Sequence, residues 1–216
     1  MSSGVGRPRA SGAAASSQDA KQAVLEAAAE LFATTGYAAT STRAVAERAG
    51  LRQATLYYHF PAKEDILCAL LAETVRPSLA VARRLLPSRV AAGARLWALA
   101  YSDIRLLGTA RHNLGALYLL PEIAAPGLAT FRAERAELKS AYRALIEQVP
   151  DEVPAATRAD LVFGLVESVT VVRRDEPRLD IDAYARHGAD AVLRVAGQSA
   201  PDDAGRATAL ALLDDP

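Results

Sequence analysis

The chain contains a single cysteine and no long apolar run, and each absence removes a class of protein. One thiol, Cys68, excludes an intrachain disulfide and a cysteine-based zinc site. A membrane helix needs about 20 consecutive apolar residues, and no run here reaches that length. The first residues also lack the charged-then-apolar order of a signal peptide. We therefore expect a cytoplasmic protein with no membrane segment.

The sequence also lacks the residue patterns of most catalytic sites. It shows no paired carboxylates beside a nucleophile, no metal-ligand spacing and no glycine-rich loop for a cofactor. An enzyme built in the helical part of the chain is therefore the least favoured interpretation, and a turnover assay would distinguish it. We expect no cofactor and no metal.

An excess of charge of either sign is missing as well, because 25 basic side chains balance 25 acidic ones. The distribution is more informative than the total. Through Lys63 the chain carries seven basic and four acidic side chains, so the first part is mildly basic and the remainder is acidic. A basic end on an acidic body is typical of a protein whose first part binds DNA.

Hydrophobic residues make up 51% of the chain, and alanine, the strongest helix former, supplies much of this share. Apolar residues recur at helical spacing between proline and glycine breaks, which predicts an all-α fold. We expect helices at about 19–35, 41–49, 52–60, from 62 onward, and at 88–107, 111–120, 127–149, 156–173 and 180–196. Pro77 is expected to break or kink the fourth of these near Arg76.

Residues 40–60, TSTRAVAERAGLRQATLYYHF, read as two short helices that Gly50 joins in a tight turn, with Pro61 ending the second. This is the layout of a helix-turn-helix, whose second helix enters the DNA major groove. The stretch resembles the DNA-binding motif of the TetR family of bacterial one-component regulators. The resemblance rests on Thr40-Ser41, Arg43, Val45-Ala46, Ala49-Gly50-Leu51, Thr55-Leu56-Tyr57-Tyr58-His59-Phe60 and Lys63-Glu64.

The motif predicts a role for each side chain that can reach DNA. Gln53 can pair with adenine, while Ala54, Thr55 and Tyr58 face the groove and Leu56 and Phe60 point inward. We expect phosphate contacts from Thr42, Arg43, Arg52, Tyr57, His59 and Lys63. The alternatives are a solvated Arg43 and a His59 that caps helix carbonyls. Ala62 supplies no side-chain cap for the next helix, so Lys63 and a DNA phosphate are expected to satisfy that helix end together.

The predicted body contains polar-tipped and aromatic residues at helical spacing that together suggest a small-molecule pocket. The candidate ligand-binding residues are Trp97, Tyr101, Arg105, Tyr118, Phe131, Arg135, Tyr142 and Glu167. Taken singly, each is explained as well by core packing. Arg135 interrupts an apolar face, so it meets an acidic protein group, meets an acidic ligand, or extends to water. Glu167 points either into the pocket or toward a dimer edge.

The last two main helices favour a homodimer. The helix at 156–173 is apolar nearly all round, and the helix at 180–196 has an apolar face with Gly188 at its centre. A two-fold partner would cover both in a four-helix seam, and the resemblance implies the same dimer. The expected organisation is a disordered arm at 1–17, a helix-turn-helix domain at 18–64, a ligand-binding and dimerisation domain at 65–198, and a flexible tail at 199–216.

These observations predict a ligand-responsive transcriptional regulator. By resemblance it is a repressor that binds a palindromic operator as a dimer and is released by a small molecule. The alternative is a constitutive or architectural DNA-binding dimer without ligand control, which a body with no cavity would favour. Arg7 and Arg9 are expected either to enter a minor groove as a flexible arm or to touch phosphates loosely.

Overall fold

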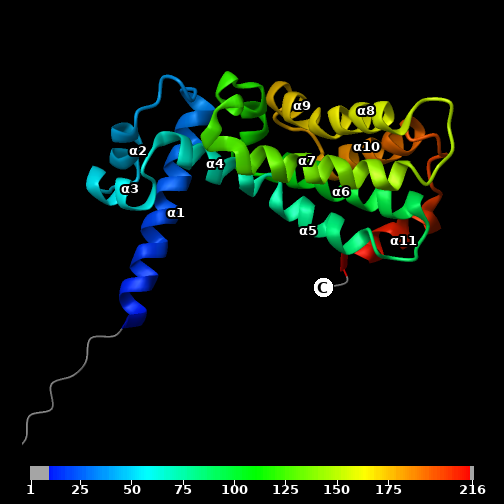
Figure 1. Ribbon diagram of the computed structural model, residues 1–216, viewed down its shortest axis with the longest axis horizontal. Coiled ribbons are helices and arrows are strands. Elements are labelled where there is room, and N and C mark those ends of the chain that lie inside the picture. The colour runs from blue at the N-terminus through cyan, green and yellow to red at the C-terminus, as the bar shows by residue number, and fades with distance from the viewer. Residues whose placement is uncertain (1–9, 215–216) are drawn as a thin grey trace, which may run out of the picture. The chain divides into compact units, whose positions relative to one another are not determined.

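The computed structural model describes residues 10–214, and in that part of the chain all regular structure is helical (Figure 1). The prediction of an all-α fold is therefore confirmed. The chain divides into two compact units, Met1–Ala69 and Leu70–Pro216, and the division falls within helix α4, Lys63–Glu73. The arginine arm predicted at Arg7 and Arg9 lies outside the described residues.

The first unit contains α1 (Ala10–Thr34), α2 (Thr42–Arg48) and α3 (Gln53–His59), which pack against one another. Gly36 and Gly50 follow α1 and α2 with φ of 92° and 68°, a left-handed conformation that glycine adopts without a steric cost. The core of this unit comprises Val24, Ala28, Phe32, Tyr37, Val45, Ala46, Leu56 and Phe60. The predicted inward direction of Leu56 and Phe60 is thus confirmed.

Helix α1 begins at Ala10, earlier than the predicted start at residue 19. The first turns of α1 are rich in alanine, which pays the smallest conformational cost in a helix. The expectation of a disordered arm at 1–17 stays a prediction.

The second unit is built around α6, Ala92–Thr109, which packs against α5, α7, α8, α9, α10 and α11. Its buried side chains include Leu96, Trp97, Leu99 and Ile104. The other elements are α5 (Arg76–Leu85), η1 (Leu114–Leu119), η2 (Pro121–Ala124), η3 (Pro126–Leu128), α7 (Ala129–Ile146), α8 (Ala155–Glu167), α9 (Val169–Asp175), α10 (Ile181–Val195) and α11 (Asp203–Asp214). Figure 1 shows α11 beside α6 at the C-terminal end of the chain.

The helix breaks follow local chemistry. Pro77 lies in the first turn of α5, where its missing N–H costs nothing, so the predicted break near Arg76 is confirmed. The predicted helix at 156–173 is instead split at Ser168, whose hydroxyl donates to the Leu165 carbonyl at 2.6 Å. Side-chain bonds of this kind compete with the helix ladder.

The expected α-helix at 111–120 is corrected in part. The chain forms the 3₁₀ helix η1 there, with a bond from the Leu120 N–H to the Leu117 carbonyl at 3.1 Å. Pro121 follows directly and lacks the N–H that an α-helical ladder would require.

The predicted flexible tail is corrected, because Asp203–Asp214 folds as α11 against α6. Arg206 binds the carboxylate of Asp190 at 2.7 Å, and the other oxygen of that carboxylate accepts the indole N–H of Trp97 at 2.7 Å. Ala209 is fully buried. The anchor is an ion pair between distant parts of the sequence, which the composition of the tail does not reveal.

Arg206→Ala is expected to weaken the packing of α11 on the rest of the unit, because it removes the ion pair between Arg206 of α11 and Asp190 of α10. Amide exchange across residues 203–214 should become about tenfold faster or more, and the melting temperature should fall. Arg186→Ala, at an exposed position of α10, is the matched control and should change neither. Equal exchange in all three proteins would show that the ion pair does not hold α11.

Candidate functional site

The recognition helix α3 is fixed to α2 through Tyr57. The Tyr57 hydroxyl lies 3.0 Å from the Thr42 hydroxyl and accepts from the Gln53 amide at 3.4 Å. Ser41 caps α2, because its hydroxyl accepts the Ala44 N–H at 3.1 Å. The structure therefore brings together three predicted DNA-contact residues, Thr42, Gln53 and Tyr57, and the Tyr57 hydroxyl connects the other two.

The outward face of α3 presents the side chains predicted to face the groove. Tyr58 is 80% exposed, Gln53 and Ala54 are also exposed, and Thr55 is half-buried. The half-buried His59 ring packs edge-on against Tyr58 with centroids 5.0 Å apart. An exposed tyrosine contributes little to folding, so its aromatic face and hydroxyl remain available to a partner.

The arginines of this surface are held only weakly. Arg43 is exposed and pairs with Glu47 of its own helix at 2.9 Å, a bond that raises the pKa of Arg43. Exposed pairs of this type contribute little, so a phosphate can replace Glu47. Arg52 stands at the N-cap of α3 and makes no side-chain capping bond. Both side chains can therefore turn toward an anion.

Lys63 contacts the turn before α2, and its predicted phosphate contact stays a prediction. Its ammonium donates to the carbonyls of Tyr37 and Thr40 at 2.8 and 2.9 Å and lies 4.1 Å from the Tyr37 ring centroid. The N-terminus of α4 is satisfied by Asp65, whose carboxylate accepts the Ala62 N–H at 2.8 Å. Lys63 thus braces the turn before α2, and one ammonium proton remains for a phosphate.

An ion pair of the first unit was missed by the sequence reasoning. Arg48 binds Glu30 with Nε–Oε1 and Nη2–Oε2 distances of 3.2 and 2.6 Å, which joins α2 to α1. The bidentate geometry fixes α2 on its scaffold. No local pattern signals this pair, because its members are 18 positions apart.

In the second unit, Arg135 of α7 meets Glu167 of α8. Its Nη2 lies 2.6 and 2.7 Å from the two carboxylate oxygens, and its Nε lies 2.9 Å from Oε1. The guanidinium carbon lies 4.8 Å from the Phe163 ring centroid and 5.4 Å from that of Tyr118. Of the alternatives left open for Arg135, pairing with an acidic protein group is the one observed.

A pocket of about 200 Å³ opens beside this pair, between η1 and the α8–α9 corner. Tyr118 and Glu167 line it together with Leu119, Gly164, Thr170 and Arg174. The structure thus places Glu167 on the lining of a pocket, and the alternative position at a dimer edge stays a prediction. Burial raises the pKa of Glu167, although the hydrogen bond and the charge of Arg135 act in the opposite direction.

Two more predicted ligand-binding residues belong to the same aromatic cluster. The Phe131 ring lies 5.8 Å from Tyr118, and the Tyr142 ring lies 5.8 Å from Phe163. Phe131 and Tyr142 are fully buried, so they form the wall behind the ion pair rather than the surface of the pocket.

The remaining three predicted residues lie in a different part of the unit. Trp97 is fully buried, stacks on Tyr101 with centroids 5.0 Å apart and donates to Asp190 of α10. Arg105 pairs with Asp182 of α10 at 2.6 Å. None of the three lines the pocket, so the structure separates them from Arg135 and places them in the α6–α10 packing.

Asp103 was not among the candidate residues, yet it is the most unusual carboxylate of the body. It is 3% exposed and accepts from the Ser78 hydroxyl at 2.7 Å and the Tyr142 hydroxyl at 3.0 Å, which connects α5, α6 and α7. Burial raises its pKa to about 6. The sequence around Asp103 gives no local sign of this burial, because its two partners lie 25 and 39 positions away.

The predicted dimer face on α10 stays a prediction, and Gly188 at its centre has a neighbour within the chain. A Cβ at Gly188 would lie 2.6 Å from the Ile104 side chain, so this glycine permits close packing on α6 within the chain. The apolar side chains that stay exposed include Leu161 of α8, at 58%, and Val171 of α9, at 47%. Gly164 faces open space.

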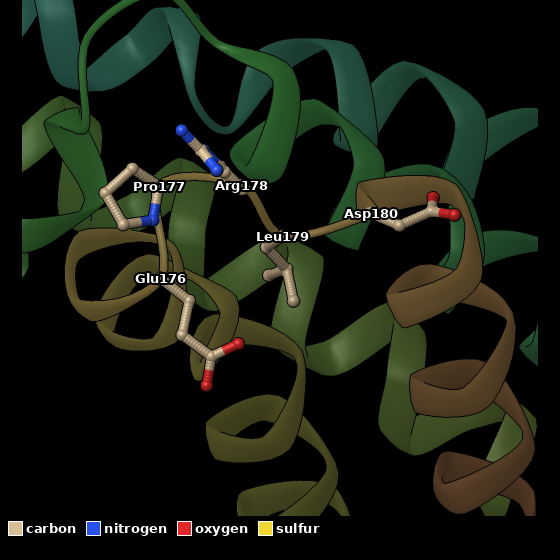
Figure 2. Close-up of a pocket in the computed structure, with 5 residues that line it drawn as sticks. All are labelled: Glu176, Pro177, Arg178, Leu179 and Asp180. Carbon is tan, nitrogen blue, oxygen red and sulfur yellow. The ribbon is translucent and has the colours of Figure 1, made fainter.

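A second pocket, of about 530 Å³, lies at the loop 176–180 between α9 and α10 (Figure 2). Asp180 caps α10 by accepting the Ala183 N–H at 3.0 Å. In Figure 2 the Glu176 carboxylate and the Arg178 guanidinium point in different directions. This pocket contains none of the predicted site residues.

Comparison with known proteins identifies the class. The model of bacterial regulatory proteins of the tetR family matches residues 24–70. The chain belongs to the TetR family, whose members are DNA-binding transcription regulators and not enzymes. The crystal structure of Mycobacterium smegmatis AmtR is 42% identical, with a TM-score of 0.81, and the match covers 90% of this chain and 94% of that chain.

Two more distant structures share the fold. AibR, in complex with isovaleryl coenzyme A and operator DNA, is 19% identical with a TM-score of 0.68, covering 85% of this chain and 100% of that chain. FadR from Bacillus subtilis, in complex with stearoyl-CoA, is 21% identical with a TM-score of 0.60, and the match covers 79% of this chain and 96% of that chain. No curated protein matches the chain.

Two absences concern residues 10–214. None of the helices there combines the length and the apolar character required to cross a membrane. Within the same residues, histidine, cysteine and acidic side chains nowhere gather as a potential metal site.

A pH dependence follows from the burial of Asp103. Since its pKa is raised from 3.8 to about 6, the folded chain keeps a proton between these values that the unfolded chain releases. This contribution to the free energy of unfolding is fully present below pH 3.8 and is lost as pH rises through 6. Glu167, Arg135, Ser78 and Tyr142 are the other groups that influence it.

Asp103→Asn removes the titrating group and keeps an acceptor for one hydroxyl. The wild-type free energy of unfolding, relative to the variant, should fall by about 2 kcal/mol between pH 4.5 and pH 7.5. Urea denaturation at several pH values measures it. Parallel pH curves for the two proteins would contradict the raised pKa.

Proposed function

We propose that this protein is a transcriptional repressor that binds a palindromic operator as a homodimer and is released by a small molecule bound beside Arg135 and Glu167. The observation that carries the proposal is that one chain holds both an exposed recognition helix and a pocket lined by Glu167, whose carboxylate pairs with Arg135. Membership of the family supports the DNA-binding part.

Sequence reading is supported by the chemistry of α3. Gln53 offers an amide that can pair bidentately with adenine, and Ala54 and Thr55 offer methyl groups to thymine. Arg43, Arg52 and His59 surround this face with donors for phosphates.

Ligand control is supported by the pocket and by one hydrogen-bond chain that leaves it. The Tyr118 hydroxyl donates to Thr74, whose own hydroxyl donates to the Leu71 carbonyl at 2.6 Å in the last turn of α4. Since α4 begins in the first unit and ends in the second, a change at Tyr118 acts on a helix shared by both. The constitutive alternative would be favoured by a body without a cavity.

Dimer formation is supported by Leu161 of α8, an apolar side chain that is 58% exposed and does not line the pocket. In a dimer the two recognition helices would lie about 34–36 Å apart, one turn of DNA, so that a palindrome matches the two-fold axis.

Selection of bound sequences from random duplex DNA at fixed salt tests this proposal. We expect a palindrome whose half-sites are about one helical turn apart. Gln53→Ala should relax the preference at one position of each half-site, because only a base contact is lost. His59→Ala should weaken all duplexes to a similar degree and lower the salt dependence. An unchanged preference in Gln53→Ala, or base-selective loss in His59→Ala, would reverse these assignments.

A further inference from the structure

We propose that the pocket beside Arg135 binds a small carboxylic acid, and that the ligand carboxylate replaces the Glu167 carboxylate on the Arg135 guanidinium. The inference rests on the proposed function only for its regulatory meaning, since binding itself can be measured without DNA. In this description Glu167 is an internal substitute that occupies the anion site when no ligand is present.

Arg135 is the fixed member of the pair. Its guanidinium carbon lies 4.8 Å from the Phe163 ring centroid and 5.4 Å from that of Tyr118, two side chains from different elements. Cation–π contacts of this kind hold the planar fork in one orientation. Nε and Nη2 face the Glu167 carboxylate, and Nη1 makes no hydrogen bond within the described residues. The fork therefore matches a second carboxylate in both shape and charge.

Glu167 is the mobile member. It lines the pocket and is the last residue of α8, directly before the break at Ser168. Within the described residues, its carboxylate accepts hydrogen bonds from Arg135 alone. Burial also raises its pKa, so rotation of the charged carboxylate into water removes a desolvation cost. An entering anion can exchange with it while the helix stays in place.

The charges around the pocket favour an acid over a base. Arg135 does not line the pocket itself, but it is bonded to Glu167, which does, so a ligand that displaces Glu167 meets the Arg135 guanidinium. Arg174 lines the pocket and pairs with its exposed neighbour Asp175 at 2.9 Å. A cationic ligand would instead have to remove Arg135 from two aromatic rings and three hydrogen bonds. Only the anion finds a preformed partner.

The volume limits the size of the acid. A pocket of about 200 Å³ equals roughly seven water molecules, which admits an acid of about ten non-hydrogen atoms or fewer. The coenzyme A thioesters bound by AibR and FadR are far larger. Gly164 keeps this space open, because a Cβ there would meet nothing within 4 Å although alanine is the better helix former.

Calorimetric titration of the whole protein at pH 7.5, in a buffer without carboxylates, tests the proposal. Acetate, propionate, butyrate and benzoate are each compared with the corresponding amide, which has nearly the same shape and no charge. At least one acid should bind, and at least tenfold more tightly than its amide. Equal binding of acid and amide, or no binding by any acid, would overturn the proposal, and neither outcome depends on a variant that folds.

Glu167→Gln removes the internal competitor and is expected to strengthen binding of the same acid about tenfold. Gly164→Phe should abolish binding by filling the pocket. Asp160→Asn is the matched control, because Asp160 pairs with Lys139 across the same two helices and does not line the pocket. Unchanged or weaker acid binding in Glu167→Gln, with Asp160→Asn at the wild-type value, would contradict the exchange.

Binding of the selected DNA duplex, measured in the same samples, separates this inference from the proposed function. An acid that binds as predicted without changing DNA affinity supports the pocket chemistry and contradicts ligand control. Release of DNA by a neutral amide that binds as tightly as its acid supports ligand control and overturns the inference.

Discussion

The ion pair between Arg135 and Glu167 is the interaction on which the ligand site that we propose in the second unit depends. The pair joins α7 to α8, is partly exposed, and is flanked by Tyr118 and Phe163. Its acidic member, Glu167, lines the pocket. Tyr118 then continues the connection to Thr74 at the end of α4. Packing, ligand chemistry and regulation thus share one set of side chains.

Arginines also organise the rest of the body, where Arg95 and Arg158, which are buried, and Arg173, which is half-buried, bind carbonyls at or just beyond helix ends. Arg95 binds the carbonyls of residues 85 and 86, Arg158 those of residues 149 and 196, and Arg173 those of residues 107 and 110. The C-terminal carbonyls of a helix lack partners and carry partial negative charge, so a cation there is stabilising. These contacts fix the helices around α6.

Local sequence patterns were sufficient to predict those helices whose ends are set by neighbouring residues in the sequence. The spacing around Gly50 and Pro61 identified α2 and α3, and Pro77 marked the start of α5. Contacts between distant positions were out of reach, because periodicity shows which face is buried and not what covers it. The partner of Arg135 lies 32 positions away, and Trp97 turned toward Asp190 instead of the pocket. The helix in the predicted tail depends on that same distant aspartate.

The central claim is that occupation of the pocket and binding of DNA are coupled in one molecule. Thermodynamic linkage makes this coupling reciprocal, so the most direct test is the affinity of the tightest-binding carboxylate with and without saturating amounts of the selected duplex. The account predicts that the duplex weakens binding of the acid by the same factor by which the acid weakens binding of the duplex. An affinity for the acid that is identical in both conditions would contradict it.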